Sequence, residues 1–224
     1  WWTEYHDPNL DFFVSKAIAN NRTLQQTMAN VERAAAALTT ARANLFPQLN
    51  YSGDLGKSKA SLNTPTGAAM GDKPIKSYEV LATASWEIDL WGKIRRQTES
   101  AQASLRATEA AHRAAISSVI GSVISTYLSI LMTEEQYKIA EETAESYHKT
   151  YQLFLLRFNH GNVSEMEVAQ AWSQWESAMV QIPQIRQNRT ELKNSLSILT
   201  GVPVEDFPKP KALDELDVPD VVAG

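Results

Sequence analysis

Cysteine is missing from all 224 residues, which excludes disulfide scaffolds, thiolate metal sites and cysteine nucleophiles. No run of about 18 apolar residues is present, so no transmembrane helix is expected. The opening Trp1-Trp2 is unlike the basic and apolar start of a signal peptide, so none is expected in this stretch. The formal net charge is −5, which argues against a basic surface that binds nucleic acid.

Motifs that mark catalytic sites are missing as well. The sequence has no phosphate-binding loop, no Gly-x-Ser-x-Gly and no His-Glu-x-x-His. Its four histidines lie far apart in the sequence, and its five methionines form no track for a soft metal. We therefore expect no enzyme activity, no cofactor and no metal site.

Proline and glycine are scarce in the middle of the chain. No proline lies between residues 75 and 182, and between Gly92 and Gly161 the only glycine is Gly121. The residues 93–159 are rich in Ala, Glu, Ser, Gln and Leu, a composition typical of a helix. A single helix over them would be roughly 100 Å long, more than the diameter of a compact domain of this mass.

This predicted helix carries a regular apolar seam. From residue 116 to residue 158, apolar residues recur in alternating steps of three and four, with one break at Glu134. That period is typical of coiled coils. The core face of an ordinary helix would explain any single heptad, but not a repeat sustained over about six heptads.

Caps and breakers predict the helix that follows. After a turn at residues 159–164, Ser164 and Glu167 have the spacing of a capping box. The helix that they start should run to about Thr200, where a glycine and a proline follow. Pro183 should kink this helix or mark a local break.

The N-terminal region should be helical too. Asp7 and Pro8 have the order of an N-cap and a first helical residue, and Asn20-Asn21 should divide the region into a short and a long helix. The whole chain is then predicted to form four segments. They are residues 1–44 with these two helices, 45–91 with two strands and a loop at 58–76, 92–200 as a long helical hairpin with its tip at 159–164, and 201–224 as an extended linker.

Two stretches between the helices alternate with period two. In the first, Leu49, Tyr51 and Leu55 alternate with polar residues. In the second, the even positions from Tyr78 to Leu90 are apolar, and most of the odd positions are polar. This pattern predicts two strands, each with one apolar and one wet face.

Two environments produce such strands. A soluble sheet packs its apolar face on a core, whereas a β-barrel turns that face to lipid. Each stretch is long enough to cross the apolar band of a barrel, about 25 Å, and very long helices offer no compact core for a sheet to cover. The membrane environment is therefore favoured, with residues 58–76 as an extracellular loop. Two strands cannot close a barrel, so more chain or more subunits would have to share it.

In this interpretation the side chains take defined positions. Aromatic residues near the strand ends would face the membrane or form its interfacial girdle: Phe46, Tyr51, Tyr78, Trp86 and Trp91. Acidic residues at polar positions would line a wet lumen: Asp54, Glu87 and Asp89. A role of Glu87 and Asp89 as a catalytic carboxylate pair is the less favoured alternative.

Five motifs in this order carry a resemblance to a known family. They are Trp1-Trp2 with Asp7-Pro8 and Leu10, the run ANLFPQL at 43–49, the run WEIDLWGK at 86–93, Arg157-Phe158 with Gly161, Val163 and Ser164, and Leu199-Thr200-Gly201. On these motifs the chain resembles the TolC-like outer-membrane efflux channel family, in particular its lipoprotein branch serving resistance–nodulation–division pumps. The resemblance covers essentially the whole chain, but only the first of two tandem repeats in such a protein.

The resemblance implies a fold and a function. The fold would be mainly α, with very long antiparallel coiled-coil helices and a two-stranded β segment that joins a shared transmembrane β-barrel. The full-length protein would be a homotrimer in the bacterial outer membrane with a periplasmic helical tunnel, and a passive exit duct for drugs or other small toxic compounds. Its partners would be a periplasmic adaptor (membrane fusion protein), an inner-membrane pump and the lipid bilayer. A lipid-bearing cysteine before Trp1 and a second repeat after residue 224 would complete it.

The resemblance also implies that the helical turn docks the adaptor. The residues concerned are Phe158, Asn159, His160, Gly161, Asn162, Val163 and Ser164. From the residues alone, Gly161 is a glycine of the kind that commonly ends a helix, and Ser164 is the N-cap of the following helix. Two other functions are alternatives, namely a soluble coiled-coil scaffold whose β-hairpin packs on a core, and a type I protein-secretion duct.

Overall fold

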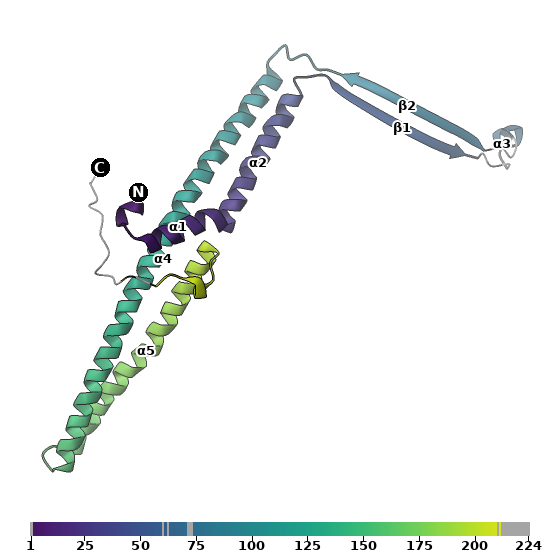
Figure 1. The fold of residues 1–224 in the computed structure, drawn as a ribbon. Coiled ribbons are helices and arrows are strands. Elements are labelled where there is room, and N and C mark those ends of the chain that lie inside the picture. The colour runs from purple at the N-terminus through teal and green to yellow at the C-terminus, as the bar shows by residue number, and fades with distance from the viewer. Residues whose placement is uncertain (1, 60, 62, 71–73, 210, 212–224) are drawn as a thin grey trace. The chain divides into compact units, whose positions relative to one another are not determined.

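The structure is a computed structural model that describes residues 2–59, 61, 63–70, 74–209 and 211. Its elements are labelled in Figure 1. They are η1 (Trp2–Tyr5), α1 (Pro8–Asn20), α2 (Arg22–Ala43), β1 (Gln48–Ser58), α3 (Pro65–Met70), β2 (Ile75–Ser85), α4 (Lys93–Asn159), α5 (Glu165–Thr200) and η2 (Val204–Asp206). The chain forms two compact units, one of residues 1–29 and 110–224, the other of residues 30–109. The boundary between the units therefore falls within α2 and α4.

The break predicted at Asn20-Asn21 is confirmed, and Asn21 causes it. The Asn21 side chain accepts hydrogen bonds from the backbone N–H groups of Thr23, at 2.9 Å, and Leu24, at 3.3 Å. It therefore caps the start of α2 directly after α1 has ended. Its amide also donates to the carbonyl of Leu199 at 2.9 Å, which fixes the α1–α2 junction to the last turn of α5.

The long helix α4 spans the 67 residues that the glycine placement predicts. The helix α5 continues through Pro183. Of the two expectations at this residue, a kink or a local break, the local break does not occur. A proline removes one backbone hydrogen bond, and the packing of α5 on α4 on both sides of it holds the remaining turns.

The core of the first unit lies where α1 and α5 pack on the middle of α4. It contains Leu10, Phe13, Val14 and Ala17 of α1, Val119, Ile120, Val123, Ile124, Tyr127, Ile130 and Leu131 of α4, and Leu196 of α5. Seam positions of α4 supply much of it, so the predicted seam faces a packed interior in this region.

Asp7 is a buried carboxylate at the edge of this core. It caps α1 by accepting from the backbone N–H of Asn9 at 2.9 Å, and the hydroxyl of Tyr127 donates to its other oxygen at 2.6 Å. Burial and this hydrogen bond raise the pKa of the Tyr127 hydroxyl. The predicted cap thus also anchors α1 to α4.

By length and composition, α4 contains one stretch that is apolar enough to cross a membrane. The search for an unbroken apolar run passed over this stretch, because polar residues interrupt it while its average hydropathy is high. A core helix passes the same test, and the apolar residues of α4 that lie in the core pack on α1 and α5.

Beyond the core, the break in the seam at Glu134 is an ion-pair site between α4 and α5. The Glu134 carboxylate accepts from Arg189 at 2.9 Å and from Lys193 at 2.7 Å, and its side chain is 26% exposed. The guanidinium of Arg189 also lies over the ring of Tyr137, 4.6 Å from its centroid. Although burial alone would raise the pKa of Glu134, the hydrogen bonds from Lys193 and Arg189 hold it below its ordinary value.

The segment between the strands departs from the predicted loop at 58–76. It contains the short helix α3, and β1 and β2 take up its first and last residues. Of the predicted linker at 201–224, the described residues include η2, while 210 and 212–224 lie outside the described residues.

We expect Glu134→Gln to lower the stability of the α4–α5 pair by about 1–2 kcal/mol near neutral pH, because the two cations lose their anionic partner. The folded pKa of Glu134 is lowered, so its contribution is present above the unfolded value of 4.5 and is lost as the pH falls. Thermal unfolding at several pH values measures this.

Glu135→Gln is the matched control, since Glu135 forms only an exposed pair with Lys138 at 3.8 Å. It should cost less than about 0.5 kcal/mol. An equal loss in both variants, or a loss in Glu134→Gln that persists in acid, would contradict the assignment.

Candidate functional site

The β-hairpin of β1 and β2 separates apolar from polar side chains. The strands pair antiparallel from Gln48 opposite Ser85 to Ser58 opposite Ile75, side by side in Figure 1. Directly paired residues lie on the same face of a sheet, so the register decides whether the two alternating patterns coincide. They do coincide. One face carries Leu49, Tyr51, Gly53 and Leu55 opposite Ala84, Ala82, Val80 and Tyr78.

This apolar face is exposed along its whole length. Leu49 is 80% exposed, Leu55 81% and Val80 88%. Large apolar side chains exposed in one contiguous row mark a surface that something else covers. A scaffold whose hairpin packs on a core of its own unit would bury this face, and within residues 30–109 the face is exposed.

The opposite face is mostly polar, with Leu81 and Ile75 as exceptions, and it carries two facing carboxylates. Asp54 pairs directly with Glu79, and Asn50 pairs with Thr83. Asp54 was expected to face a wet lumen, and it lies on the polar face. Glu79 was missed, although it occupies an odd, polar position in the same alternation that selected Glu87 and Asp89.

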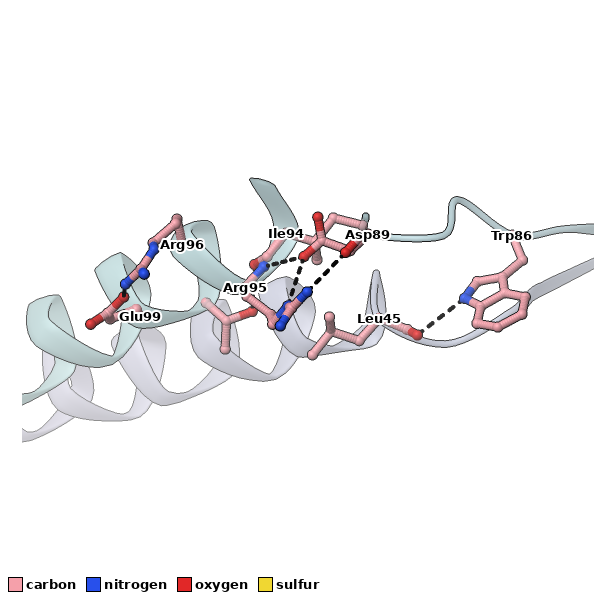
Figure 2. A network of polar contacts seen from close by, with 8 residues as sticks. Leu45, Trp86, Asp89, Ile94, Arg95, Arg96 and Glu99 are labelled. Carbon is pink, nitrogen blue, oxygen red and sulfur yellow. Dashed lines mark hydrogen bonds and ion pairs between the residues drawn. The ribbon is translucent and has the colours of Figure 1, made fainter. Parts of the chain in front are cut away.

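The aromatic residues expected at the membrane are exposed and lie toward the strand ends. Tyr51 is 91% exposed near the start of β1, and Tyr78, at 73%, lies near the start of β2, hence toward the opposite end of the hairpin. Phe46, Trp86 and Trp91 flank the strands and are 66%, 58% and 94% exposed. The indole N–H of Trp86 donates to the carbonyl of Leu45 at 3.2 Å, which closes the base of the hairpin (Figure 2).

Glu87 and Asp89 do not lie on a strand, contrary to prediction. β2 ends at Ser85, and the residues from Trp86 to Gly92 lead into α4 without strand pairing. The alternation continues through this stretch in the sequence, but β1 begins only at Gln48, opposite Ser85, and Pro47 before it has no N–H to donate to a longer ladder. The predicted placement of Glu87 and Asp89 on a strand is therefore wrong.

Asp89 instead caps the first turn of α4, as Figure 2 shows. Its carboxylate accepts from the backbone N–H of Arg95 at 2.9 Å and lies 3.5 Å from the Arg95 Nε. The Arg95 guanidinium also donates to the Asp89 carbonyl at 3.0 Å. Although desolvation alone would raise the pKa of Asp89, the backbone N–H groups of Arg95 and Ile94 and the Arg95 guanidinium lower it overall. Glu87 forms only an exposed ion pair with Lys93, at 3.5 Å.

The turn between α4 and α5 is built from two caps that meet. Asn162 N–H donates to the carbonyl of Arg157 at 2.9 Å, and Gly161 N–H donates to that of Phe158 at 2.8 Å. This is the Schellman pattern, with Gly161 at a φ of +74°. Ser164 then caps α5, its N–H donating to the Glu167 carboxylate at 2.7 Å, so the predicted capping box is confirmed.

The turn presents an exposed surface. The seven predicted tip residues from Phe158 to Ser164 are exposed except Val163, which is half-buried. Leu156 and Met166 add exposed apolar area beside them, 56% and 70% respectively. The seam pattern could not select these two residues, because they lie off it. His160 is held by a contact of 2.8 Å from its Nδ1 to the Leu156 carbonyl.

The protein-family comparison decides the family. The sequence pattern of the outer membrane efflux proteins matches residues 13–202. The chain belongs to the outer membrane efflux protein family.

Relatives in this family have related sequences along the whole chain. The pyoverdine export outer membrane protein OpmQ of Pseudomonas aeruginosa is 30% identical over 230 residues, which cover 100% of this chain and 48% of OpmQ. The probable efflux pump outer membrane protein TtgC of Pseudomonas putida is 29% identical over 228 residues, 100% of this chain and 46% of TtgC. The chain spans about half the length of the curated relatives it matches.

Solved structures of outer membrane channels share the fold. The Campylobacter jejuni CmeC channel superposes with a TM-score of 0.80 at 28% identity, covering 100% of this chain and 47% of CmeC. The open state of the Neisseria gonorrhoeae MtrE channel gives 0.76 at 26% identity, covering 97% of this chain and 48% of MtrE. The efflux protein fold, mainly α with a β segment, agrees with the fold class that the resemblance implied.

We expect Asp89→Asn to weaken the first turn of α4 in this efflux protein, because the helix N-terminus loses its anion and Arg95 its partner. Protection of the Ile94 and Arg95 amides from hydrogen exchange should fall. Since the folded pKa of Asp89 is lowered from 3.8, the wild-type advantage should be present above that pH and disappear as the pH falls.

Glu87→Gln is the control for loss of one carboxylate in the same segment. It should leave the exchange of both amides unchanged, because Glu87 contacts only an exposed lysine. If the two variants behaved alike, the capping role of Asp89 would be wrong.

Proposed function

We propose that this chain is part of a channel subunit that forms a passive exit duct across the bacterial outer membrane and the periplasm. In this proposal β1 and β2 line and face a transmembrane β-barrel, and the helices form the periplasmic tunnel. The duct uses no cofactor and catalyses no reaction, since a partner pump supplies the energy. Its cargo would be drugs or other small toxic compounds.

The observation that carries the proposal is the two-faced hairpin. Its apolar face is exposed and its opposite face is mostly polar, with Leu81 and Ile75 as exceptions, which suits a wall between lipid and water. A barrel wall satisfies both faces of such a strand pair, because lipid covers one and water the other. The match to outer membrane efflux proteins supports the same setting.

The barrel must be shared. The two-stranded sheet of β1 and β2 leaves one edge of each strand without a partner among the described residues. In hydrocarbon each unpaired N–H or C=O costs several kcal/mol, so further strands have to close the ring. We propose that these strands come from the remainder of the subunit and from two further copies in a homotrimer.

The turn between α4 and α5 is proposed to dock a periplasmic adaptor, which links the duct to an inner-membrane pump. Three features support this: the exposed tip, the apolar side chains of Leu156 and Met166 beside it, and the fixed backbone of the two caps. A rigid, exposed turn loses little conformational entropy when a partner binds.

The lipid-facing side of the hairpin can be tested with a pair of adjacent residues. Ala82 lies on the apolar face opposite Tyr51, and Thr83 lies on the polar face opposite Asn50. In the full-length protein, Ala82→Arg should disfavour membrane insertion by about 2–4 kcal/mol, because an arginine is placed in hydrocarbon. Flotation with lipid vesicles measures insertion.

Thr83→Arg is the matched control, because it adds the same side chain one residue along the strand. It should insert normally and change the single-channel conductance in a planar bilayer, since its charge enters the lumen. Equal insertion of both variants, or no insertion of the wild-type protein, would refute the proposed barrel wall.

The docking tip can be tested at Gly161. Gly161→Asp places a charge at the tip and should weaken binding of the cognate adaptor about tenfold, while stability falls by about 1 kcal/mol because φ is positive there. Gly161→Asn carries the same backbone strain without the charge and should bind with intermediate affinity. Adaptor binding that is unchanged in both variants, measured beside their unfolding temperatures, would exclude the tip as the docking site.

A further inference from the structure

The apolar face of the hairpin ends in a pair of lysines. Lys57 and Lys76 are directly paired, two residues beyond the pair of Leu55 and Tyr78 and therefore on the same face. Both lysines are exposed. They lie at the end of the hairpin that is joined through α3, away from the ends that lead to α2 and α4.

Two like charges directly opposite each other destabilise an antiparallel pair. The only carboxylates of β1 and β2 are Asp54 and Glu79, and both lie on the opposite face. Neither strand therefore supplies an anion on the face that carries Lys57 and Lys76. An anion from outside the strands would relieve the repulsion of the pair.

The position of the pair along the face indicates which anion. The band from Leu49 to Leu55 advances six residues along β1, about 20 Å at the rise of a strand, and at the tilt of barrel strands it covers about 15 Å of the roughly 25 Å apolar layer. The next position on this face belongs to Lys57 and Lys76. Their alkyl chains lie along hydrocarbon while their ammonium groups reach the headgroup layer.

We propose that Lys57 and Lys76 together bind the phosphate group of an anionic lipid headgroup in the outer leaflet of the membrane. The inference rests on the proposed function, which places this face in lipid. A lysine near an anionic membrane surface contributes enough that loss of both should weaken anionic lipid binding about 30-fold. The contribution should shrink as salt is raised, because both ammonium groups lie at the aqueous boundary.

The test uses the full-length protein in mixed detergent micelles, with phosphatidylglycerol as the anionic probe and phosphatidylcholine as the zwitterionic one. Native mass spectrometry gives the dissociation constant of each lipid. Lys57→Gln with Lys76→Gln should raise that of phosphatidylglycerol about 30-fold and leave that of phosphatidylcholine unchanged. Lys57→Arg with Lys76→Arg should retain the wild-type preference, since the charge is kept.

A second double variant controls for net charge. Lys138→Gln with Lys149→Gln removes two exposed lysines of α4, which lie outside the hairpin. It should bind phosphatidylglycerol like the wild type. An equal loss in this variant, or an unchanged affinity in the Lys57 and Lys76 variant, would overturn the proposal. Complete displacement of the lipid by inorganic phosphate would also overturn it, because the pair would then be a site for free anions.

Flotation with vesicles separates this inference from the proposed function. If the wild type fails to float, the barrel wall itself is wrong. If the wild type and the glutamine variant both float and bind phosphatidylglycerol equally, only the lysine site is wrong.

Discussion

A strand pair with one apolar and one polar face has to be covered from outside itself. In β1 and β2 the register aligns the two alternations, so the face from Leu49 to Leu55 is apolar, while the opposite face is mostly polar and includes Leu81 and Ile75. Water satisfies only the polar face, and the free strand edges still require partners. In the proposed barrel wall, lipid covers the apolar face, solvent covers the polar face, and further strands pair with the free edges.

In the helical unit, long helices are held together although their buried core is small. Its buried apolar cluster lies where α1 and α5 meet the middle of α4. Polar contacts extend the attachment beyond that cluster. Asp7 with Tyr127 ties α1 to α4, Asn21 ties the α1–α2 junction to α5, and Glu134 ties α4 to α5. Each of these contacts fixes the rotation of one helix relative to another, which apolar packing alone fixes less strictly.

Much of the local structure could be predicted from the sequence because it depends on neighbours a few residues apart. Glycine placement predicts the bounds of α4, and the spacing of Ser164 and Glu167 predicts the start of α5. The end of β2 could not be predicted in this way. Alternation continues past Ser85, but a strand needs a partner, and β1 begins only at Gln48. Pairing is a long-range property that a periodic pattern does not contain.

The same limit explains the residues of the candidate site that were misplaced or missed. Asp89 follows the alternation, yet the N–H groups of a helix that starts four residues later compete for its carboxylate. Glu79 is notable because it pairs with Asp54, and Lys57 because it pairs with Lys76. Neither pairing is known before the register is known. Leu156 lies off the seam and Met166 follows the turn, and the exposure of both depends on the turn that joins the helices.

The junction between strands and helices has a mechanical consequence. The Asp89 carboxylate accepts a hydrogen bond from the first turn of α4, and the Trp86 indole donates one to the Leu45 carbonyl after α2. Two hydrogen bonds therefore hold the short segment that follows β2. We expect this junction between β2 and α4 to bend less than the helices that extend from it. In the proposed duct, a twisting motion that widens or narrows the helical tunnel would therefore deform the helices along their length. The end of the duct that carries the strands would stay unchanged.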